Sequence, residues 1–361
     1  MAQAALDHLG EVPSGLCWRA CAMPFVTSAM HHWRRALGVA MLLAACAALT
    51  AVCWWPFDVV LPVAEHILQR RRLLLRMPWS RPKKEYPIVM MHGVTSNEWV
   101  FYTMQQWIKG KSPSRKTFAL ALYDNQESFT SLNAQLPEIA EAIRNNPELA
   151  GGYDLVCHSQ GALLCRCLVE YMDKPPFARR LISLAGPQMG VFGDKMEWGD
   201  FAKNMVVQLD AGTVAYTNLA QMSNSIANMW NDPLRHDEFL HGNLFVAVYN
   251  GLTDDPERNA RRKYNFAKLE KAVFLVGDYG KEQYEGGIEP WQSGIFGYYK
   301  DGSDSEIVPM EDSEVFKNDT FGLKTLHDTG RLVVKSVPGV GHSAWVMDGS
   351  LFDKYIWPHL E

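Results

Sequence analysis

The pattern of apolar and polar positions changes after Pro82. From there on, short apolar runs without polar alternation recur, and stretches with apolar residues at helical spacing separate them. Apolar strands that alternate with helices are typical of a parallel sheet covered on both faces. We therefore predict an α/β fold with a mostly parallel sheet in a domain over residues 82–361, with strands at residues 86–91, 117–123, 153–157, 180–185, 271–277 and 331–337.

The alternation of strands and helices is interrupted between residues 187 and 265. This stretch is rich in Asn, Gly, Met and aromatic residues. An insertion between two strands of such a sheet is where a lid would cover a site. Its Met and aromatic side chains could pack among themselves or line a groove for an apolar ligand, and the pattern alone favours packing. We predict a lid-like insertion over residues 187–265.

The region before the predicted domain contains an apolar segment, Ala36–Phe57, that lacks charged residues. The segment is long enough to span a bilayer. It follows a positive flank and contains small residues that suit signal peptidase. The chain is therefore predicted to enter the secretory route, with the segment either cleaved or kept as a membrane anchor. A start at Met30 instead of Met1 would give a conventional signal-peptide layout.

A basic block, residues 69–84, follows the apolar segment. It is either a solvated linker or a contact with anionic lipid headgroups, and the lack of periodicity favours the linker. We assign residues 1–81 to a signal or anchor region followed by this basic linker.

Composition narrows the function classes. The chain has 361 residues, 47% of them hydrophobic and 21% charged, which is typical of globular proteins. The formal net charge of −5 leaves no overall basic field for nucleic acid. The seven cysteines form no CxxC pair and no Cys/His cluster with zinc spacing. We predict no metal, no cofactor and no nucleic-acid partner.

The stretch "VCHSQGALLC" places Ser159 between a predicted strand and a predicted helix. A serine on such a turn projects its hydroxyl outward, as in the nucleophile elbow G-x-S-x-G. Gly161 supplies the second glycine, and Cys157 replaces the first with a fairly small residue. A helix N-cap is the alternative role for this serine.

A serine hydroxyl needs a base to take its proton and a carboxylate to orient that base. With a nucleophile elbow, the chain order is serine, acid, histidine. His342 follows the last predicted strand, where the base belongs, although most single histidines have surface or core roles. The acid should follow the preceding strand, where Asp278 and Glu285 are both candidates.

Acyl transfer also needs backbone donors for an oxyanion. One expected donor is the N–H of Gln160, directly after the nucleophile. The other is the N–H of Val94, because Gly93 allows a tight turn after the first predicted strand. The "HG" dipeptide could otherwise be a plain strand-ending turn.

Several motifs, in the same order along the chain, resemble the palmitoyl-protein thioesterases, and are closer to that family's second lysosomal branch than to its first. The resemblance runs from about Pro87 to the C-terminus. It implies an α/β-hydrolase fold that removes long fatty acyl groups from thioesters, with Ser159 as nucleophile and His342 as base. The motifs are "PIVMMHGV", "CHSQGALLCR", "LAGPQMGVFGD", "MWNDPLRHDEFL", "PWQSGIFGYY", "FGLKTL" and "GHSAW".

The resemblance is imperfect at the acid. The family has an Asp five residues before the proline of the "PWQS"-like motif, and counting back from Pro290 gives Glu285. The chain also carries an insertion between Gly277 and Gly286. A Glu can serve in this fold, so we favour Glu285. Asp278 stays an alternative because a longer loop can bring it back to the histidine.

Two further expectations follow from the resemblance. The spacing of Cys157 and Cys165 is similar to that of paired cysteines in the family, although two buried free thiols remain the alternative. Family members are typically soluble, glycosylated lysosomal proteins. The sequon Asn318-Asp319-Thr320 would be used only in a lumenal domain.

We therefore predict a serine hydrolase that cleaves palmitoyl and other long-chain acyl thioesters, from S-acylated proteins or acyl-CoA, through an acyl-serine intermediate. A lipase or carboxylesterase with the same triad is one alternative, since sequence does not separate oxygen esters from thioesters. A membrane-anchored, non-catalytic acyl-chain-binding protein is another, supported by the changed acid position. The expected location is the lysosome or a similar compartment of the secretory pathway.

Overall fold

The computed structural model describes residues 85–193, 214–278 and 287–361. All of them belong to one compact unit, Lys84–Glu361. The predicted anchor Ala36–Phe57, the basic block and Glu285 lie outside the described residues, and the domain division stays a prediction. Within the described ranges, no helix is long and apolar enough to cross a membrane.

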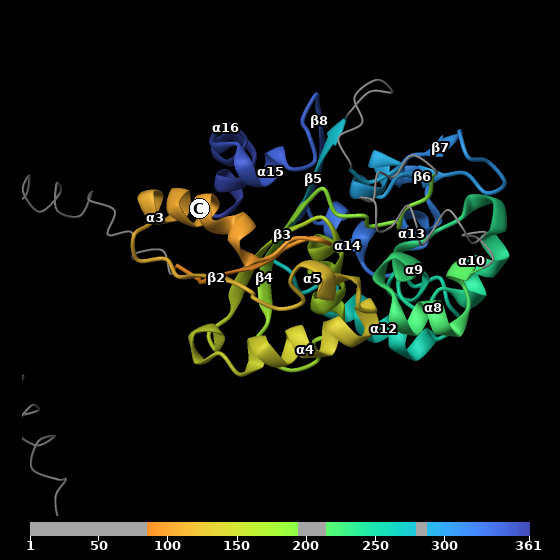
Figure 1. Ribbon diagram of the computed structural model, residues 1–361, viewed down its shortest axis with the longest axis horizontal. Coiled ribbons are helices and arrows are strands. Elements are labelled where there is room, and N and C mark those ends of the chain that lie inside the picture. Colours follow the sequence, from red (N-terminus) through yellow and green to blue (C-terminus); the bar gives the residue numbers. More distant parts are fainter. Residues whose placement is uncertain (1–84, 194–213, 279–286) are drawn as a thin grey trace, which may run out of the picture. The chain divides into compact units, whose positions relative to one another are not determined.

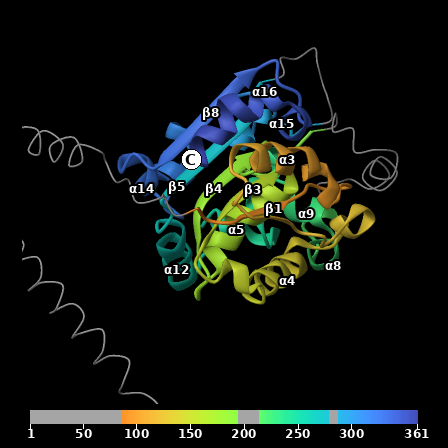
Figure 2. The ribbon, with the colours of Figure 1, turned by 90° about the vertical axis from the view of Figure 1, so that its left-hand side faces the viewer.

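The predicted parallel sheet is confirmed. Its strand order is β2-β1-β3-β4-β5-β8, and every neighbouring pair is parallel (Figure 1). Figure 2 shows β8, β5, β4, β3 and β1 side by side in this order. The sheet order and the turn after β3 are those of the α/β-hydrolase fold that the resemblance implied. The strands are β1 (Ile88–Met91), β2 (Thr117–Ala119), β3 (Tyr153–His158), β4 (Ala178–Leu184), β5 (Lys271–Asp278) and β8 (Leu332–Pro338).

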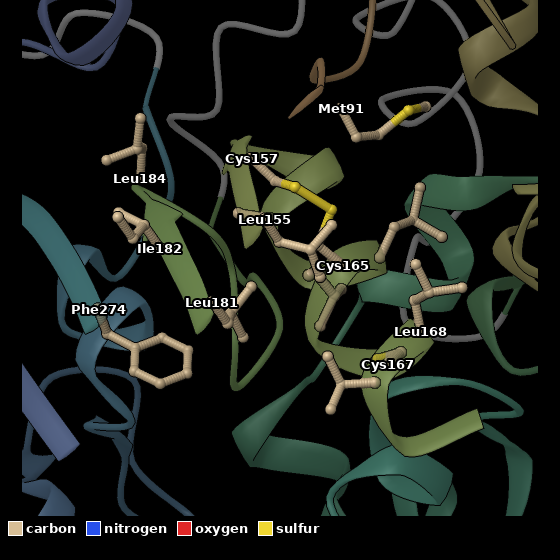
Figure 3. Packing of buried hydrophobic residues seen from close by; sticks show 14 of the residues in the cluster. Met91, Leu155, Cys157, Cys165, Cys167, Leu168, Leu181, Ile182, Leu184 and Phe274 are labelled. Atoms are coloured by element: carbon tan, nitrogen blue, oxygen red, sulfur yellow. A yellow bond between two sulfur atoms is a disulfide. The ribbon is translucent and has the colours of Figure 1, made fainter. Parts of the chain in front are cut away.

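Helices cover both faces of the sheet, which explains why the central strands contain so few polar residues. Helix α5 (Gln160–Tyr171) packs on β1, β3 and β4, with α4 (Leu132–Arg144) and α12 (Pro256–Phe266) against it. In Figure 1, α3 (Tyr102–Lys111) and α15 (Ala344–Met347) lie on the other side. Figure 3 shows the core around β3, β4 and α5, where Leu155, Leu168, Leu181, Ile182 and Phe274 are fully buried.

The remaining described elements are short. They include the antiparallel strands β6 (Tyr298–Tyr299) and β7 (Ile307–Val308), helices α13 (Glu314–Lys317), α14 (Leu323–Asp328) and α16 (Gly349–Leu351), and a π-helical turn η7 (Phe352–Ile356). The 3₁₀ turns are η1 (Glu98–Phe101), η2 (Asn125–Phe129), η3 (Pro147–Leu149), η4 (Pro233–Arg235), η5 (Trp291–Ile295), η6 (Met310–Asp312) and η8 (Trp357–His359).

Strand β2 is shorter than the predicted strand at residues 117–123. The N–H of Leu120 still bonds the carbonyl of Met90 at 3.0 Å. The chain then turns away, since Tyr123 has a φ of 59°. An apolar run can therefore continue past the end of a ladder when its last residues pack beside the sheet instead of pairing.

The insertion consists of short helices, α8 (Asn218–Ser223), α9 (Ser225–Met229), α10 (His236–Gly242) and α11 (Val246–Tyr249), before α12; its residues 194–213 lie outside the described ranges. Its aromatic and Met side chains mostly pack in the core, as the pattern favoured: Phe239 and Met229 are each 1% exposed. Its buried amide side chains form hydrogen bonds to the rest of the domain. Asn228 Oδ1 accepts the N–H of Leu132 at 2.7 Å and the hydroxyl of Ser131 at 2.8 Å. These two hydrogen bonds connect the insertion to the start of α4.

Candidate active site

Ser159 occupies the single residue between β3 and α5. Its backbone has φ 55° and ψ −131°, a strained conformation for a residue with a Cβ. The strand before it and the helix after it hold this conformation, and its N–H donates to the carbonyl of Leu184 at 2.9 Å. The sharp strand-to-helix turn predicted from "CHSQG" is present.

Two glycines let other segments approach the elbow closely. A Cβ on Gly161 would lie 2.3 Å from the carbonyl oxygen of His92 and 2.4 Å from that of Met91. Helix α5 therefore meets the end of β1 without room for a side chain. A Cβ on Gly93 would lie 2.6 Å from the Cβ of Ser159 and 3.0 Å from its Oγ. The loop after β1 thus lies directly against the serine.

The two expected oxyanion donors belong to these closely packed segments. Gln160 is the first residue of α5, where a backbone N–H has no acceptor within the helix. Val94 follows Gly93 in the loop beside the serine. Ser128 connects both segments: its carbonyl accepts the Gln160 side-chain amide at 2.8 Å, and its hydroxyl accepts the Thr95 N–H at 2.7 Å.

His342 lies in the loop after β8 and is 9% exposed. It contacts the residue before Ser159: the rings of His158 and His342 have centroids 4.7 Å apart, and His158 Nε2 is 2.9 Å from the His342 carbonyl oxygen. Among the described residues, no hydrogen bond joins the Ser159 hydroxyl to His342. The structure thus brings the segments of Ser159 and His342 together without a hydrogen bond between the two side chains. Catalytic hydrogen bonds are often long before substrate binds.

Burial controls the charge of both histidines. Removal from water lowers the pKa of His342 well below its ordinary value, and the adjacent His158 lowers it further. Burial likewise lowers the pKa of His158 to about 4. His342 is consequently an uncharged imidazole, able to accept a proton, at mildly acidic as well as neutral pH.

The expected acid is not seen bonded to His342 in the described part of the chain. Nδ1 of His342 is buried and has no hydrogen-bond partner among the described residues. Asp278, the last residue of β5, is described: it lies opposite Pro338 of β8, and its carbonyl accepts the N–H of Gly339 at 2.9 Å. Its carboxylate does not bond Nδ1 of His342. Glu285 lies outside the described residues.

A disulfide joins Cys157, at the end of β3, to Cys165 in α5 (Figure 3). It closes a loop that contains Ser159. Cys167, two residues further on, is a buried free thiol. Asn318 of the sequon is exposed at the end of α13, and the Thr320 hydroxyl donates to the carbonyl of Asn250 at 2.6 Å.

The structure brings the loop that carries Val94 and the loop that carries His342 to the Ser159 turn, whereas sequence reasoning assigned no role to His158. Its partner is 184 residues away in the chain, so no local pattern could reveal the contact. The described ranges contain no group of three or more His, Cys, Asp or Glu side chains that could hold a metal ion.

Known proteins match most of the chain. The palmitoyl protein thioesterase family model matches residues 87–342. The lysosomal thioesterase PPT2 of Rattus norvegicus is 34% identical over 277 residues, covering 76% of this chain and 87% of that protein. Palmitoyl-protein thioesterase 3 of Dictyostelium discoideum is 31% identical over 268 residues, covering 74% and 88%. Among solved structures, mature Bacillus licheniformis lipase BlEst2 has a TM-score of 0.44 at 15% identity, covering 78% of this chain and 95% of that one. Because the family model matches most of the chain and the two thioesterases are more than 30% identical to it, the chain belongs to the palmitoyl protein thioesterase family.

Proposed function

We propose that the protein hydrolyses long-chain fatty acyl thioesters, from S-acylated proteins or acyl-CoA, through an acyl-serine formed on Ser159. The observation that carries this proposal is the strained elbow, with Ser159 beside the Gly93 loop and His342 held against the preceding residue. Family membership supports the same reaction class, because matched relatives are named lysosomal and palmitoyl-protein thioesterases.

In the first step, Oγ of Ser159 attacks the thioester carbonyl carbon while Nε2 of His342 takes the hydroxyl proton. The carbonyl oxygen becomes an oxyanion, which the N–H groups of Gln160 and Val94 stabilise. The C–S bond then breaks, and the leaving thiolate takes up the proton held on Nε2 of His342, so that a thiol departs and the imidazole is neutral again. A thiolate is a good leaving group, so this step needs little help from an acid.

In the second step, water attacks the acyl-serine carbon and gives a proton to His342. The same two N–H groups hold the second oxyanion. The bond between the acyl carbon and Oγ breaks, the proton returns to Oγ, and the fatty acid leaves. Ser159 and His342 are then in their starting states, so the cycle needs no cofactor.

We assign the triad acid to Glu285. Its position five residues before Pro290, where the family carries its acid, supports Glu285, and Asp278 stays the alternative. A carboxylate there would hold the His342 tautomer with Nε2 free to accept the serine proton.

We place the acyl chain beneath the insertion. A cavity of about 290 Å³ has Met189, Phe239 and Tyr298 in its wall, together with charged side chains such as Lys300 and Asp301. The apolar and aromatic part of this wall suits a hydrocarbon chain. Met189 lies in the segment that follows β4, the strand whose Leu184 carbonyl accepts the Ser159 N–H.

The proposed location is the lysosome, reached through the secretory route. The names of the mammalian relatives support it. Glycosylation at Asn318 belongs to the same proposal.

The test compares hydrolysis of palmitoyl-CoA and of p-nitrophenyl palmitate by the full chain. Ser159→Ala should lower kcat by roughly 10⁴- to 10⁶-fold, and Glu285→Gln by about 10⁴-fold, with Asp278→Asn close to wild type. Ser305→Ala, at an exposed serine, is the matched control.

Each other result has a definite reading. Loss in Asp278→Asn alone would move the acid to that residue. Turnover of the oxygen ester without the thioester would indicate a lipase or carboxylesterase. Acyl-chain binding without any turnover would indicate a non-catalytic binding protein and contradict the proposal.

A further inference from the structure

His158 lies between the nucleophile and the base, and the mechanism above does not use it. It is the last residue of β3, directly before Ser159, and only 6% of it is exposed. Its ring lies against that of His342, with a centroid distance of 4.7 Å and an interplanar angle of 47°. Its Nε2 is 2.9 Å from the carbonyl oxygen of the same residue. One side chain thus contacts both the backbone and the ring of the proposed base.

The chemistry of this contact fixes the tautomer of His158. A backbone carbonyl oxygen only accepts hydrogen bonds, so the proton must be on Nε2 of His158. Burial lowers the pKa of His158 to about 4, which keeps the ring in this uncharged Nε2–H form across neutral and mildly acidic pH. The donor is therefore present throughout that range, without a positive charge beside the base.

The loop that carries His342 has little regular structure to hold it. Strand β8 ends at Pro338, Gly339 has a φ of 73°, and α15 begins only at Ala344. Displacing a catalytic group by about 1 Å can lower a rate roughly 100-fold. A base on such a loop therefore needs an anchor on a rigid element, and the end of a fully buried strand is one.

We infer that His158 is a positioning residue, which fixes His342 relative to Ser159 through its Nε2–H bond to the His342 carbonyl and its ring contact. Because His158 and Ser159 are consecutive at the end of β3, the same strand end places the nucleophile and anchors the base. The inference depends on the proposed role of His342 as base.

Two substitutions separate the hydrogen bond from the ring. His158→Phe keeps a planar ring and removes the donor, whereas His158→Gln keeps an N–H donor of similar reach and removes the ring. Turnover of palmitoyl-CoA by the full chain is divided by the number of active serines, counted with a covalent fluorophosphonate. We expect His158→Phe to lower kcat by about 10- to 100-fold with KM within about twofold, and His158→Gln to recover most of this loss.

A purely structural role would give a different result. It would reduce the fraction of active serines and the Tm while leaving kcat per active serine unchanged. That outcome, or wild-type kcat in His158→Phe, or equal losses in both variants, would overturn the inference. If instead the wild-type chain fails to turn over palmitoyl-CoA or to label at Ser159, the proposed function is what fails.

A measurement on the wild-type protein keeps the inference testable even if His158→Phe does not fold. In ¹⁵N-histidine-labelled protein at pH 5.5, the Nε2 signal of His158, assigned by its loss in His158→Gln, should be that of a protonated, hydrogen-bonded nitrogen in a neutral ring. A charged ring, or a neutral ring protonated on Nδ1, would contradict the bond to His342.

Discussion

The sheet around the elbow and the insertion over residues 214–265 both contain buried residues, but different interactions stabilise them. In the sheet, backbone groups pair along parallel ladders, so the side chains of β1 can all be apolar and those of β3 are apolar except for Asp154 and His158. In the insertion, short helices leave many backbone groups without partners, and Gln221, Asn228 and Asn243, nearly unexposed, bond them.

The difference shows that residues buried to the same depth can tolerate different kinds of substitution. An apolar core tolerates substitutions that conserve volume. It does not tolerate an added side chain at a glycine that permits a close approach. A network of buried amides tolerates neither loss nor replacement of a member, because each loss leaves other buried groups unpaired. The experiments below test this contrast, from the largest expected effect to the smallest.

Gly161→Ala should give the largest loss. Its Cβ would meet two backbone carbonyl oxygens, those of His92 and Met91, and neither can move without shifting β1. We expect the free energy of unfolding to fall by about 3 kcal/mol or more, measured by urea denaturation. Gly110→Ala in α3, where nothing lies within 4 Å, is the control and should stabilise by roughly 0.5–1 kcal/mol. Equal effects would refute the close-approach argument.

The elbow region should also lose stability in acid. The folded-state pKa of His158 is lowered to about 4 from an ordinary 6.5, so its contribution is complete above pH 6.5 and is lost as pH falls toward 4. The loss amounts to about 3 kcal/mol at most. Urea titrations at pH 7, 5.5 and 4.5 should show a shallower pH dependence in His158→Gln than in wild type. Identical slopes would mean that His158 does not titrate as proposed.

Asn228→Ala tests the insertion. It removes the acceptor of the Leu132 N–H and the Ser131 hydroxyl, and we expect a loss of about 1–3 kcal/mol. Asn133→Ala, at an exposed position of α4, should leave stability unchanged or slightly higher. The comparison uses thermal unfolding at one pH. If both variants behave alike, buried amides are not what holds the insertion to the core.

Leu219→Ser should have the smallest effect. Leu219 is in α8 of the insertion and is 80% exposed, so we expect a change within about 0.5 kcal/mol. Leu155→Ala, at a fully buried position of β3, should cost about 2–5 kcal/mol in the same urea assay. A large loss at Leu219 would show that a further surface covers α8.

The sequence was most informative where one physical requirement governs a whole segment. The buried strands appear as apolar runs, and "CHSQG" marks the elbow because only a small residue such as Gly161 fits against β1. The two-residue strands β6 and β7 are too short to produce a pattern. The Asn-rich stretch was recognised as an interruption, but a buried amide and an exposed one look identical in sequence.

The site was predictable to a lesser extent. Ser159 and His342 could be proposed from their places after strands, because strand ends of a parallel sheet meet at one edge. The acid could not be narrowed to one residue in this way, since the loop after β5 departs from the family in both length and residue type. The contact between His158 and His342 depends on how two distant segments pack, which no single segment encodes.

The disulfide at the elbow has a consequence for the order of events during biosynthesis. Cys157 and Cys165 are 0% and 2% exposed, so neither sulfur is open to attack by a soluble thiol once α5 has docked. Thiol–disulfide exchange requires that access. The bond must therefore form while the strand and helix are still coming together. Oxidation of this cysteine pair is then a step of maturation that precedes the docking of α5.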